Sequence, residues 1–503
     1  MTSAASLPSV SRQLIANLIG RAWVLFSNFL FLPVYLHVLG ILNFGVVALF
    51  MALASLVAFL DLGLAPTLAR ELNDQGHSAD QKQDLLYSYE LAFSALAVLI
   101  MVVVVVLPID AFQWLVSESD FARPEISQAM RLVFLASIAQ LWLNFYLASL
   151  LGVEQHVKAN ALLVAAGIVR SALVILPLWI WPSPSLFLWW QLLVALGVAL
   201  VARGMLYRLL DTSRHSRPPV FDARLLLRNS TFSGAVLLIS ITAAVNTQID
   251  KVFIGRMQGL EALSAYSLVI TVAQLLVFGI TPITLMLTPR LVRIVSSREA
   301  RDVTALFELA HRFVAALVCA GVGFLAWFGP DLIALWTAGK IKAETVSPYM
   351  PMLVLGYGFL ALQMVPHSLA LAHKNMRGSL VIASSIFLTV PGYGIAIERF
   401  GAQGAAGTWL VLQACIFPLY FCWVLKSHTG LERGLHLLYS TVLLPLAAAW
   451  LVAFAASHLI GAPDIPFRNI AIMAGAALVC TGACAWLTLR PCDRSLLMKM
   501  LNR

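Results

Sequence analysis

Two arginines lie inside apolar stretches of this sequence, and their position suggests binding chemistry. Arg170 stands roughly 15 Å into the apolar run that begins at Asn160, at about 1.5 Å of rise per helical residue. A charge that deep in a bilayer is costly and is usually held toward a cavity or a partner. Ala166, Gly167 and Ser171 leave space beside it. Two interpretations stay open: Arg170 binds a substrate, or it pairs with a carboxylate or with carbonyl groups nearby.

Arg21 is the second candidate, and it lies only about 10 Å from the nearer end of its apolar run. Asn17, Arg21 and Asn28 fall on one side of that helix, because steps of four and seven residues return to the same face. Tyr35 is less closely aligned with them. A polar stripe of this kind indicates a water-filled cavity. The alternative is that Arg21 extends its charge to the membrane surface.

Two further predicted helices carry mostly uncharged polar side chains at similar spacing. These are Ser137, Gln140 and Asn144 in one helix, and Thr242, Asn246 and Asp250 in the other. Such surfaces suit sugar hydroxyls, so Gln140, Asn144 and Asn246 join Asn28 as candidate substrate contacts. For any single residue, the alternative is a hydrogen bond between helices.

Five titratable residues are candidates for a gate or for coupling to a proton or sodium ion: Asp61, Glu90, Asp250, Lys251 and His367. Structural roles compete with each of these. Asp61 can stabilise a turn, His367 can be a satisfied core histidine, and the adjacent Asp250 and Lys251 can anchor a helix end. The identity of any coupling ion stays open.

The elements that must position these residues are membrane-spanning helices. Of the 503 residues, 60% are hydrophobic and 11% are charged, whereas soluble domains carry roughly a quarter charged residues. About fourteen apolar helices are expected, so the predicted fold class is an all-α polytopic membrane protein. The polar links, of which 73–84 and 211–228 are among the longest, are too short to fold as a catalytic domain.

No phosphate-binding glycine loop, metal cluster or nucleophile–base motif occurs in the sequence. The six cysteines show no metal-ligand spacing and are not expected to form disulfides. We therefore expect no cofactor and no bound metal.

The net charge of +9 is distributed unevenly along the chain. An even number of helices places both termini on one side, where about 23 Lys and Arg residues lie, against about six on the other side. The positive-inside rule then predicts that both termini are cytoplasmic. The sequence has no soluble basic segment that could bind nucleic acid, so nucleic acid is not expected as a partner.

A weak internal repeat suggests how the helices are grouped. Gly40 maps onto Gly259 and Phe59 onto Phe278, about 219 residues later. We predict a six-helix lobe over 12–210, a second over 228–427 and an additional helix pair over 436–489. Two related lobes are a common plan for transporters that rock around a central site.

Several motifs resemble those of bacterial polysaccharide-export flippases of the Wzx type, within the multidrug/oligosaccharidyl-lipid/polysaccharide exporter superfamily. In the first half they are Leu39-Gly40-x-x-x-Phe44-Gly45, then Asp61-Leu62-Gly63-Leu64 and Arg70. In the second half they are Gln248-Ile-Asp250-Lys251-Val-Phe-Ile-Gly255, with Gly259 and Tyr266. Ser264 departs from the pattern, because the family commonly has glycine there.

The resemblance implies a fold similar to that of multidrug (MATE) transporters and a transporter rather than an enzyme. Its expected substrate is an undecaprenyl-diphosphate-linked oligosaccharide, moved from the cytoplasmic to the periplasmic leaflet by alternating access for O-antigen or exopolysaccharide synthesis. Arg170 and Arg21 would hold the diphosphate, because arginine binds phosphate bidentately. Gln140 and Asn144 would contact the sugars. Expected partners are membrane lipid and polysaccharide polymerase or export machinery.

Two alternatives stay open, one within transport and one from another class of function. A drug/cation antiporter of the same superfamily is expected to use acidic residues in its cavity, whereas the deepest charge here is basic. A membrane enzyme, such as a glycan polymerase or ligase, generally needs a substantial periplasmic loop, and the sequence shows none.

Overall fold

The computed structural model describes residues 10–490, except for 75, 211–217, 298–299, 374, 376–377, 379–388, 427–430 and 460–465. Some helical side chains, including those of Arg21 and Asn28, also lie outside the described part. Every regular element that is described is a helix, and twelve of these helices are long and apolar enough to cross a membrane. The predicted all-α membrane architecture is therefore confirmed. The chain divides into two compact units, Met1–Ser264 and Ala265–Arg503.

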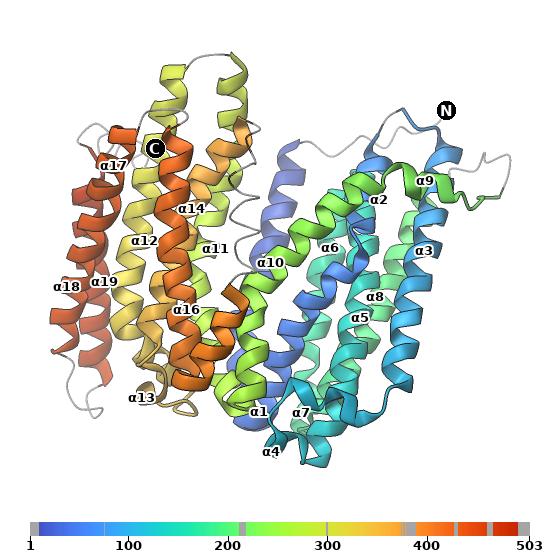
Figure 1. The fold of residues 1–503 in the computed structure, drawn as a ribbon, viewed down its shortest axis with the longest axis horizontal. Coiled ribbons are helices and arrows are strands. Elements are labelled where there is room, and N and C mark those ends of the chain that lie inside the picture. The colour runs from blue at the N-terminus through green and yellow to red at the C-terminus, as the bar shows by residue number, and fades with distance from the viewer. Residues whose placement is uncertain are drawn as a thin grey trace. The chain divides into compact units, whose positions relative to one another are not determined.

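The first unit consists of the following helices (Figure 1). They are α1 (Val10–Val57), η1 (Ala58–Asp61), α2 (Leu64–Asn73), α3 (Ala79–Val106), η2 (Ile109–Leu115), α4 (Glu118–Phe121), α5 (Pro124–Gly152), α6 (His156–Gly167), η3 (Ile168–Leu173), α7 (Ile175–Ile180), α8 (Pro184–Leu210), α9 (Ala223–Arg228), α10 (Ser230–Met257) and the start of α11 (Leu260–Ser297).

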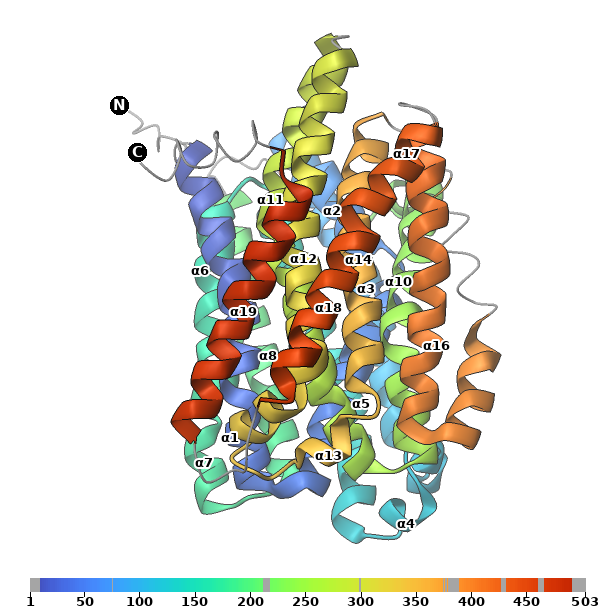
Figure 2. The same ribbon diagram turned by 90° about the vertical axis from the view of Figure 1, so that its left-hand side faces the viewer.

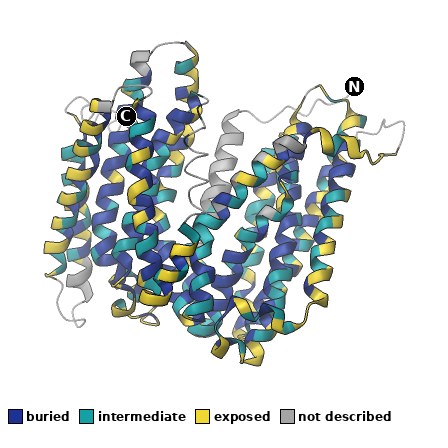
Figure 3. Cartoon of the chain, in the orientation of Figure 1, coloured by how far each residue is buried: buried dark blue, intermediate teal, exposed yellow. Residues whose placement is uncertain are grey.

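Helix α5 forms the core of the first unit. It begins at Pro124, where the missing N–H is not needed by the helix. Every residue from Ala136 to Leu141 is buried, so other helices surround α5 on all sides over this stretch. Its neighbours are α1, α2, α3 and α8, and buried residues follow its length in Figure 3. Gln140 lies in this enclosed stretch.

A bend at Gly40 divides α1 into two arms. Gly40 has φ 78° and ψ 166°, a conformation that residues with a Cβ rarely adopt. Gly259, at the turn between α10 and α11, has φ 86°. The two glycines that the repeat aligns thus both have left-handed φ values at turns between apolar helices, which supports the repeat. The turns also meet, because Ser264 Oγ donates to the carbonyl oxygen of Ile41 at 2.6 Å.

The second unit contains the rest of α11 and the following helices. They are α12 (Ala300–Trp336), α13 (Ala343–Val346), α14 (Met350–Ala372), α16 (Val390–Lys426), α17 (Leu431–Leu438), η5 (Tyr439–Leu443), α18 (Leu444–Ser457) and α19 (Pro466–Thr488). Helix α16 bends at Gly401, where φ is 59°.

The last two long helices, α18 and α19, pack on α12 and on each other (Figure 2). Small residues allow this close approach: a Cβ on Gly323 of α12 would come within 2.7 Å of Ala449 on α18. Cys319, Cys480 and Cys484 are buried in the same contact. Part of the apolar surface of α18 and α19 is therefore buried against α12 in the second unit.

The described residues carry twelve spans rather than the fourteen expected. Two features explain the difference. Helix α1 counts as one span because it continues through the bend at Gly40. Most of the helix expected near residue 387 falls on 379–388, outside the described residues. The predicted lobes, 12–210 and 228–427, and the pair 436–489 remain predictions.

Alanine substitutions at Gly63 and Gly40 are expected to differ in their effect on stability. Gly63 is in the left-handed α region, where alanine costs about 1–2 kcal/mol. Gly40, with ψ 166°, is in a region essentially restricted to glycine, where alanine costs about 1–3 kcal/mol. A Cβ on Gly63 would also lie 2.5 Å from the carbonyl oxygen of Ser233, whereas one on Gly40 would meet no atom within 4 Å. Overpacking of this kind costs about 1–3 kcal/mol more.

We therefore expect Gly63→Ala to lower the membrane abundance and melting temperature of the purified protein, and Gly40→Ala to lower both less. Size-exclusion profiles of fluorescent fusions and thermal melts measure these effects. Equal losses for the two variants would contradict the close approach of Gly63 to α10.

Candidate functional site

Arg170 lies in η3, a π-helical segment that follows α6. Such segments shift the backbone hydrogen bonds of a helix and are frequent at functional sites. Side chains from other helices bond three successive carbonyl oxygens of this segment. Trp190 Nε1 donates to Val169 O at 2.9 Å, Gln191 Nε2 to Arg170 O at 3.1 Å and Tyr35 OH to Ser171 O at 2.6 Å. Helices α1 and α8 thereby fix the backbone on which Arg170 is carried.

The guanidinium of Arg170 reaches α5. Its Nη1 donates to Gln140 Oε1 at 2.7 Å, so two of the predicted site residues are in direct contact. Three buried polar atoms of this cluster have no hydrogen-bond partner among the described residues: Arg170 Nε, Gln140 Nε2 and Gln191 Oε1. Buried polar atoms are normally paired, so a polar ligand that reached these three atoms could complete their hydrogen bonds. Two of the three atoms are donors, as an anion requires.

The space beside Arg170 is smaller than the sequence suggests. A Cβ on Gly167 would lie 2.5 Å from Trp23 Nε1. The indole of Trp23, on α1, therefore fills the gap that glycine leaves. Trp23 Nε1 is itself buried without a partner in the described part of the chain. It is a further unpaired donor, beside Gly167, which precedes Arg170 by three residues.

The other predicted substrate contacts are less well placed. Arg21 and Asn28 lie outside the residues whose side chains are described. Asn144 is one helical turn beyond Gln140 on α5 and is exposed. Asn246, on α10, is half-buried, and its Oδ1 has no partner among the described residues. Gln140 is thus the predicted contact that the fold brings to Arg170.

Glu90 is held in a network of its own. Its carboxylate accepts hydrogen bonds from Tyr146 OH at 2.7 Å, from Arg203 Nε and from Tyr207 OH. The Arg203 guanidinium also lies over the Tyr207 ring, 4.7 Å from its centre. These contacts join α3, α5 and α8. They give Glu90 a structural role that competes with the predicted coupling role.

Asp61 lies at the end of η1, before the turn into α2. Its Oδ1 accepts the N–H of Gly63 at 2.7 Å. Burial raises the pKa of the Asp61 carboxyl, and the N–H groups of Gly63 and Ala65 oppose that shift. Asp61 therefore stabilises this turn.

Asp250 and Lys251 are both buried in α10. Lys251 Nζ donates to Gln248 Oε1 at 2.6 Å and to Thr247 O at 3.2 Å, while the Lys251 N–H donates to Asp250 Oδ1. These bonds hold the ammonium against its own helix. A gate formed with the other lobe stays a prediction.

His367 belongs to the second unit. Its side chain is exposed, and its Nδ1 lies 3.3 Å from Tyr420 OH. The Pro366 that precedes it is buried within α14.

The sequence analysis missed two groups of residues. Gln191 and Trp190 hold the Arg170 backbone, and no pattern in α8 marked them. In α12, Glu308 and Arg312 form a buried ion pair at 2.8 Å. Their i,i+4 spacing was a signal that could have identified the pair. His311, between them in sequence, is fully buried beside the rings of Phe307 and Phe421.

Among the described residues, no group of three or more His, Cys, Asp or Glu side chains could hold a metal ion. Near Arg170 the described residues offer hydrogen bonding and a positive charge.

Comparison with known proteins identifies the fold and the family. Over 98% of this chain and 99% of the other, the structure matches that of the lipid II flippase MurJ in an inward closed conformation, with TM-score 0.63 and 13% identity. It matches an inward-facing multidrug resistance MATE family transporter of the MOP superfamily over 84% and 96%, with TM-score 0.58 and 14% identity. These likenesses confirm the predicted MATE-like fold.

A third match is the MATE multidrug transporter DinF-BH, over 85% and 98% of the two chains, with TM-score 0.58 and 12% identity. A comparison with curated proteins finds no match. The family model described as polysaccharide biosynthesis protein matches residues 13–295, more than half of the 503 residues. On this ground the resemblance drawn from the sequence motifs is confirmed, and the chain belongs to the polysaccharide biosynthesis protein family.

Proposed function

We propose that this protein is a flippase for an oligosaccharide linked to undecaprenyl diphosphate. It moves this lipid from the cytoplasmic to the periplasmic leaflet of a bacterial inner membrane by alternating access, in the synthesis of a surface polysaccharide. The observation that carries the proposal is the buried cluster of Arg170, Gln140 and Gln191, which has unpaired donors around a permanent positive charge.

Arg170 is the residue that binds the diphosphate in this proposal. A guanidinium can donate two parallel hydrogen bonds to phosphate oxygens, and its charge is not lost by deprotonation. Its Nη1 bond to Gln140 orients it, and its Nε is left to donate. Arg21 is the second proposed cation. Gln140, Asn144, Asn246 and Asn28 are proposed to contact the glycan.

The acidic residues favour this proposal over a drug/cation antiporter. A cation exchanger needs carboxylates that are available for binding. Glu90 accepts hydrogen bonds from three side chains, and Asp61 accepts the N–H of Gly63 in a turn. Neither carboxylate is presented as a cation site in the first unit.

The orientation is also a proposal. The excess of Lys and Arg on the side shared by the termini places both termini in the cytoplasm. Fluorescence from a C-terminal green fluorescent protein fusion tests it, because that protein does not become fluorescent when exported unfolded to the periplasm.

Deletion of the gene is expected to cause lipid-linked repeat units to accumulate in the cell and surface glycan to disappear. A flippase acts between synthesis of the repeat unit on one leaflet and its polymerisation on the other, so its loss stops the pathway with complete units still attached to lipid. Mass spectrometry of extracted lipid-linked sugars measures the accumulation. Complementation with the intact gene should reverse it.

Other outcomes point to other functions. Export of single, unpolymerised repeat units to the surface would indicate a polymerase. Unchanged lipid-linked sugars together with increased drug sensitivity would indicate a drug transporter. Either result would overturn the proposal.

A further inference from the structure

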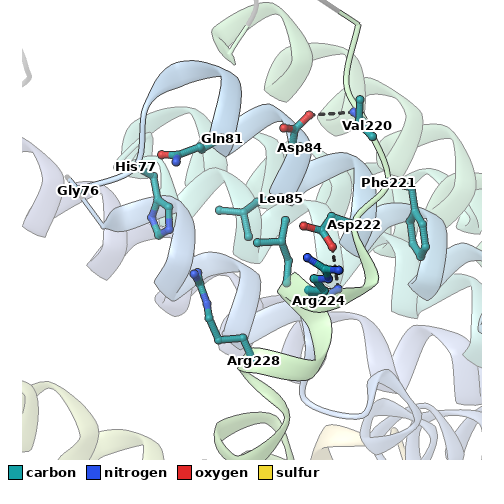
Figure 4. A pocket seen from close by; sticks show the side chains of 11 residues that line it. Gly76, His77, Gln81, Asp84, Leu85, Val220, Phe221, Asp222, Arg224 and Arg228 are labelled. Carbon is teal, nitrogen blue, oxygen red and sulfur yellow. Dashed lines mark hydrogen bonds between the residues drawn. The ribbon is translucent and has the colours of Figure 1, made fainter.

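A cavity of about 640 Å³ lies in the first unit, away from Arg170. It is formed where α2 passes into α3 and where residues 220–222 lead into α9 (Figure 4). Its polar lining consists of His77, Gln81, Asp84, Asp222, Arg224 and Arg228. Because α3 begins here, the cavity lies at the end of a helix that is long and apolar enough to cross a membrane.

The hydrogen-bond donors of this cavity are largely unused. The guanidinium of Arg224 makes no hydrogen bond or ion pair with any residue that the structure describes. Arg228 makes one long contact, between Nη2 and Glu71 Oε2 at 3.4 Å. The two arginines are four residues apart, so they lie on one face of α9. Gln81 Oε1 accepts the N–H of Ser78 at 2.8 Å, which leaves the amide NH₂ group to donate.

The carboxylates of the cavity are directed to the backbone. Asp84 Oδ1 accepts the N–H of Val220 at 2.8 Å, and Asp222 Oδ1 accepts the N–H of Arg224 at 2.8 Å (Figure 4). Each carboxylate therefore uses one oxygen to hold the backbone that forms the cavity wall. The result is a recess that presents more donors than acceptors to a ligand.

His77 supplies a further group at the same recess. Its Nδ1 is buried without a hydrogen bond among the described residues, 3.9 Å from Asp74 Oδ2. Its Nε2 lies 3.8 Å from Glu71 Oε2, the oxygen that Arg228 also contacts. Glu71 thus contacts both Arg228 and His77 at the edge of the cavity.

We propose that this cavity binds a phosphate group at the membrane surface. Two arginines on one helix face, with an amide donor opposite them on α3, match the several acceptor oxygens of a phosphate or diphosphate. The ligand would bridge α3 and α9, and so tie the first helices of the chain to the segment that leads into α10. A phospholipid headgroup and a soluble phosphate share this chemistry. The proposal does not depend on the transported substrate.

The test uses the full-length protein in nanodiscs and two probes. Binding of inorganic pyrophosphate is measured by calorimetry in discs of phosphatidylcholine. Retention of phosphatidylglycerol is measured by native mass spectrometry in discs that contain both lipids. Arg224→Gln is expected to weaken binding by roughly tenfold or more, because one charge-assisted contact is lost. Arg224→Lys should keep part of the affinity.

Two further variants sharpen the comparison. Gln81→Glu keeps an oxygen that can accept the N–H of Ser78 in the capping box of α3, but replaces the donor amide with a negative charge. It should therefore weaken binding as well. Arg208→Gln is the matched control, because Arg208 is an exposed arginine of α8 that does not line the cavity. Its affinity should equal that of the unmodified protein. Melting temperatures of all variants establish that they are folded.

The outcomes separate the sources of the ligand. Pyrophosphate binding without lipid retention identifies a soluble phosphate, and lipid retention without pyrophosphate binding identifies a headgroup. Equal affinity of Arg224→Gln and the unmodified protein would overturn the proposal, as would the absence of saturable binding of both probes. Arg224→Gln should cause the same loss of binding in an Arg170→Ala background, so failure of the transport proposal is distinguishable from failure of this one.

Discussion

Replacing Arg170 with alanine is expected to reduce glycan export by tenfold or more while leaving most of the protein in the membrane. The reason is that a hydrogen bond to a charged group contributes about 1.5–3 kcal/mol, and the proposed diphosphate would lose such bonds together with the attraction of the charge. Lysine keeps the charge but loses the planar fork, so Arg170→Lys should retain partial export. Arg170→Glu should be worse than alanine, because it repels the phosphate.

Surface glycan and membrane abundance must be measured together for these variants, because Arg170 also contacts Gln140 on α5. Trp190→Phe is a matched control: it removes the bond to the Val169 carbonyl without removing the guanidinium. If Arg170 served only to bridge helices, Arg170→Ala and Trp190→Phe would both lower export in proportion to abundance. Full export by Arg170→Ala at normal abundance would remove Arg170 from the proposed site.

The sequence predicted those features of the molecule that depend on local pattern. Apolar runs predicted the membrane-spanning helices, because a bilayer sets their length and composition. Gly40 and Gly259 were aligned by the repeat, and both take left-handed φ values at turns. Arg170 and Gln140 were each selected as polar residues inside apolar helices, and the fold brings them into contact.

The remaining features depend on which helices become neighbours, and helical periodicity does not encode that. It assigns a residue to a face but not the helix that this face meets. The bond of Tyr35 to Ser171 spans 136 residues, and the pairing of Glu90 with Arg203 spans 113. The π-helical turn at Arg170 is likewise held from outside, by Trp190 and Gln191 on α8. The partners of these residues are determined by how the helices pack against one another.

Removing the carboxylate of Glu90 is expected to destabilise the first unit by about 2–3 kcal/mol. Only 11% of the Glu90 side chain is exposed, whereas 47% of the Arg203 side chain is exposed. Most of the lost stability therefore comes from the hydroxyls of Tyr146 and Tyr207, which lose their acceptor, rather than from the ion pair. A polar group left without its partner costs about 1–3 kcal/mol when it is buried. Glu90→Ala should therefore lower membrane abundance and melting temperature clearly. Glu125→Ala, which removes an exposed carboxylate at the start of α5, should change neither.

A combined substitution decides between this structural role and the coupling role predicted for Glu90. Removing one partner of a buried hydrogen bond is costly, whereas replacing both partners with apolar groups can be nearly neutral. If the network is structural, Glu90→Met combined with Tyr146→Phe and Tyr207→Phe should recover part of the abundance and of the export that Glu90→Met alone has lost. If Glu90 carries a coupling proton instead, the combined variant should be abundant but inactive. In that case export by Glu90→Gln should also lose any dependence on the proton gradient, at normal abundance.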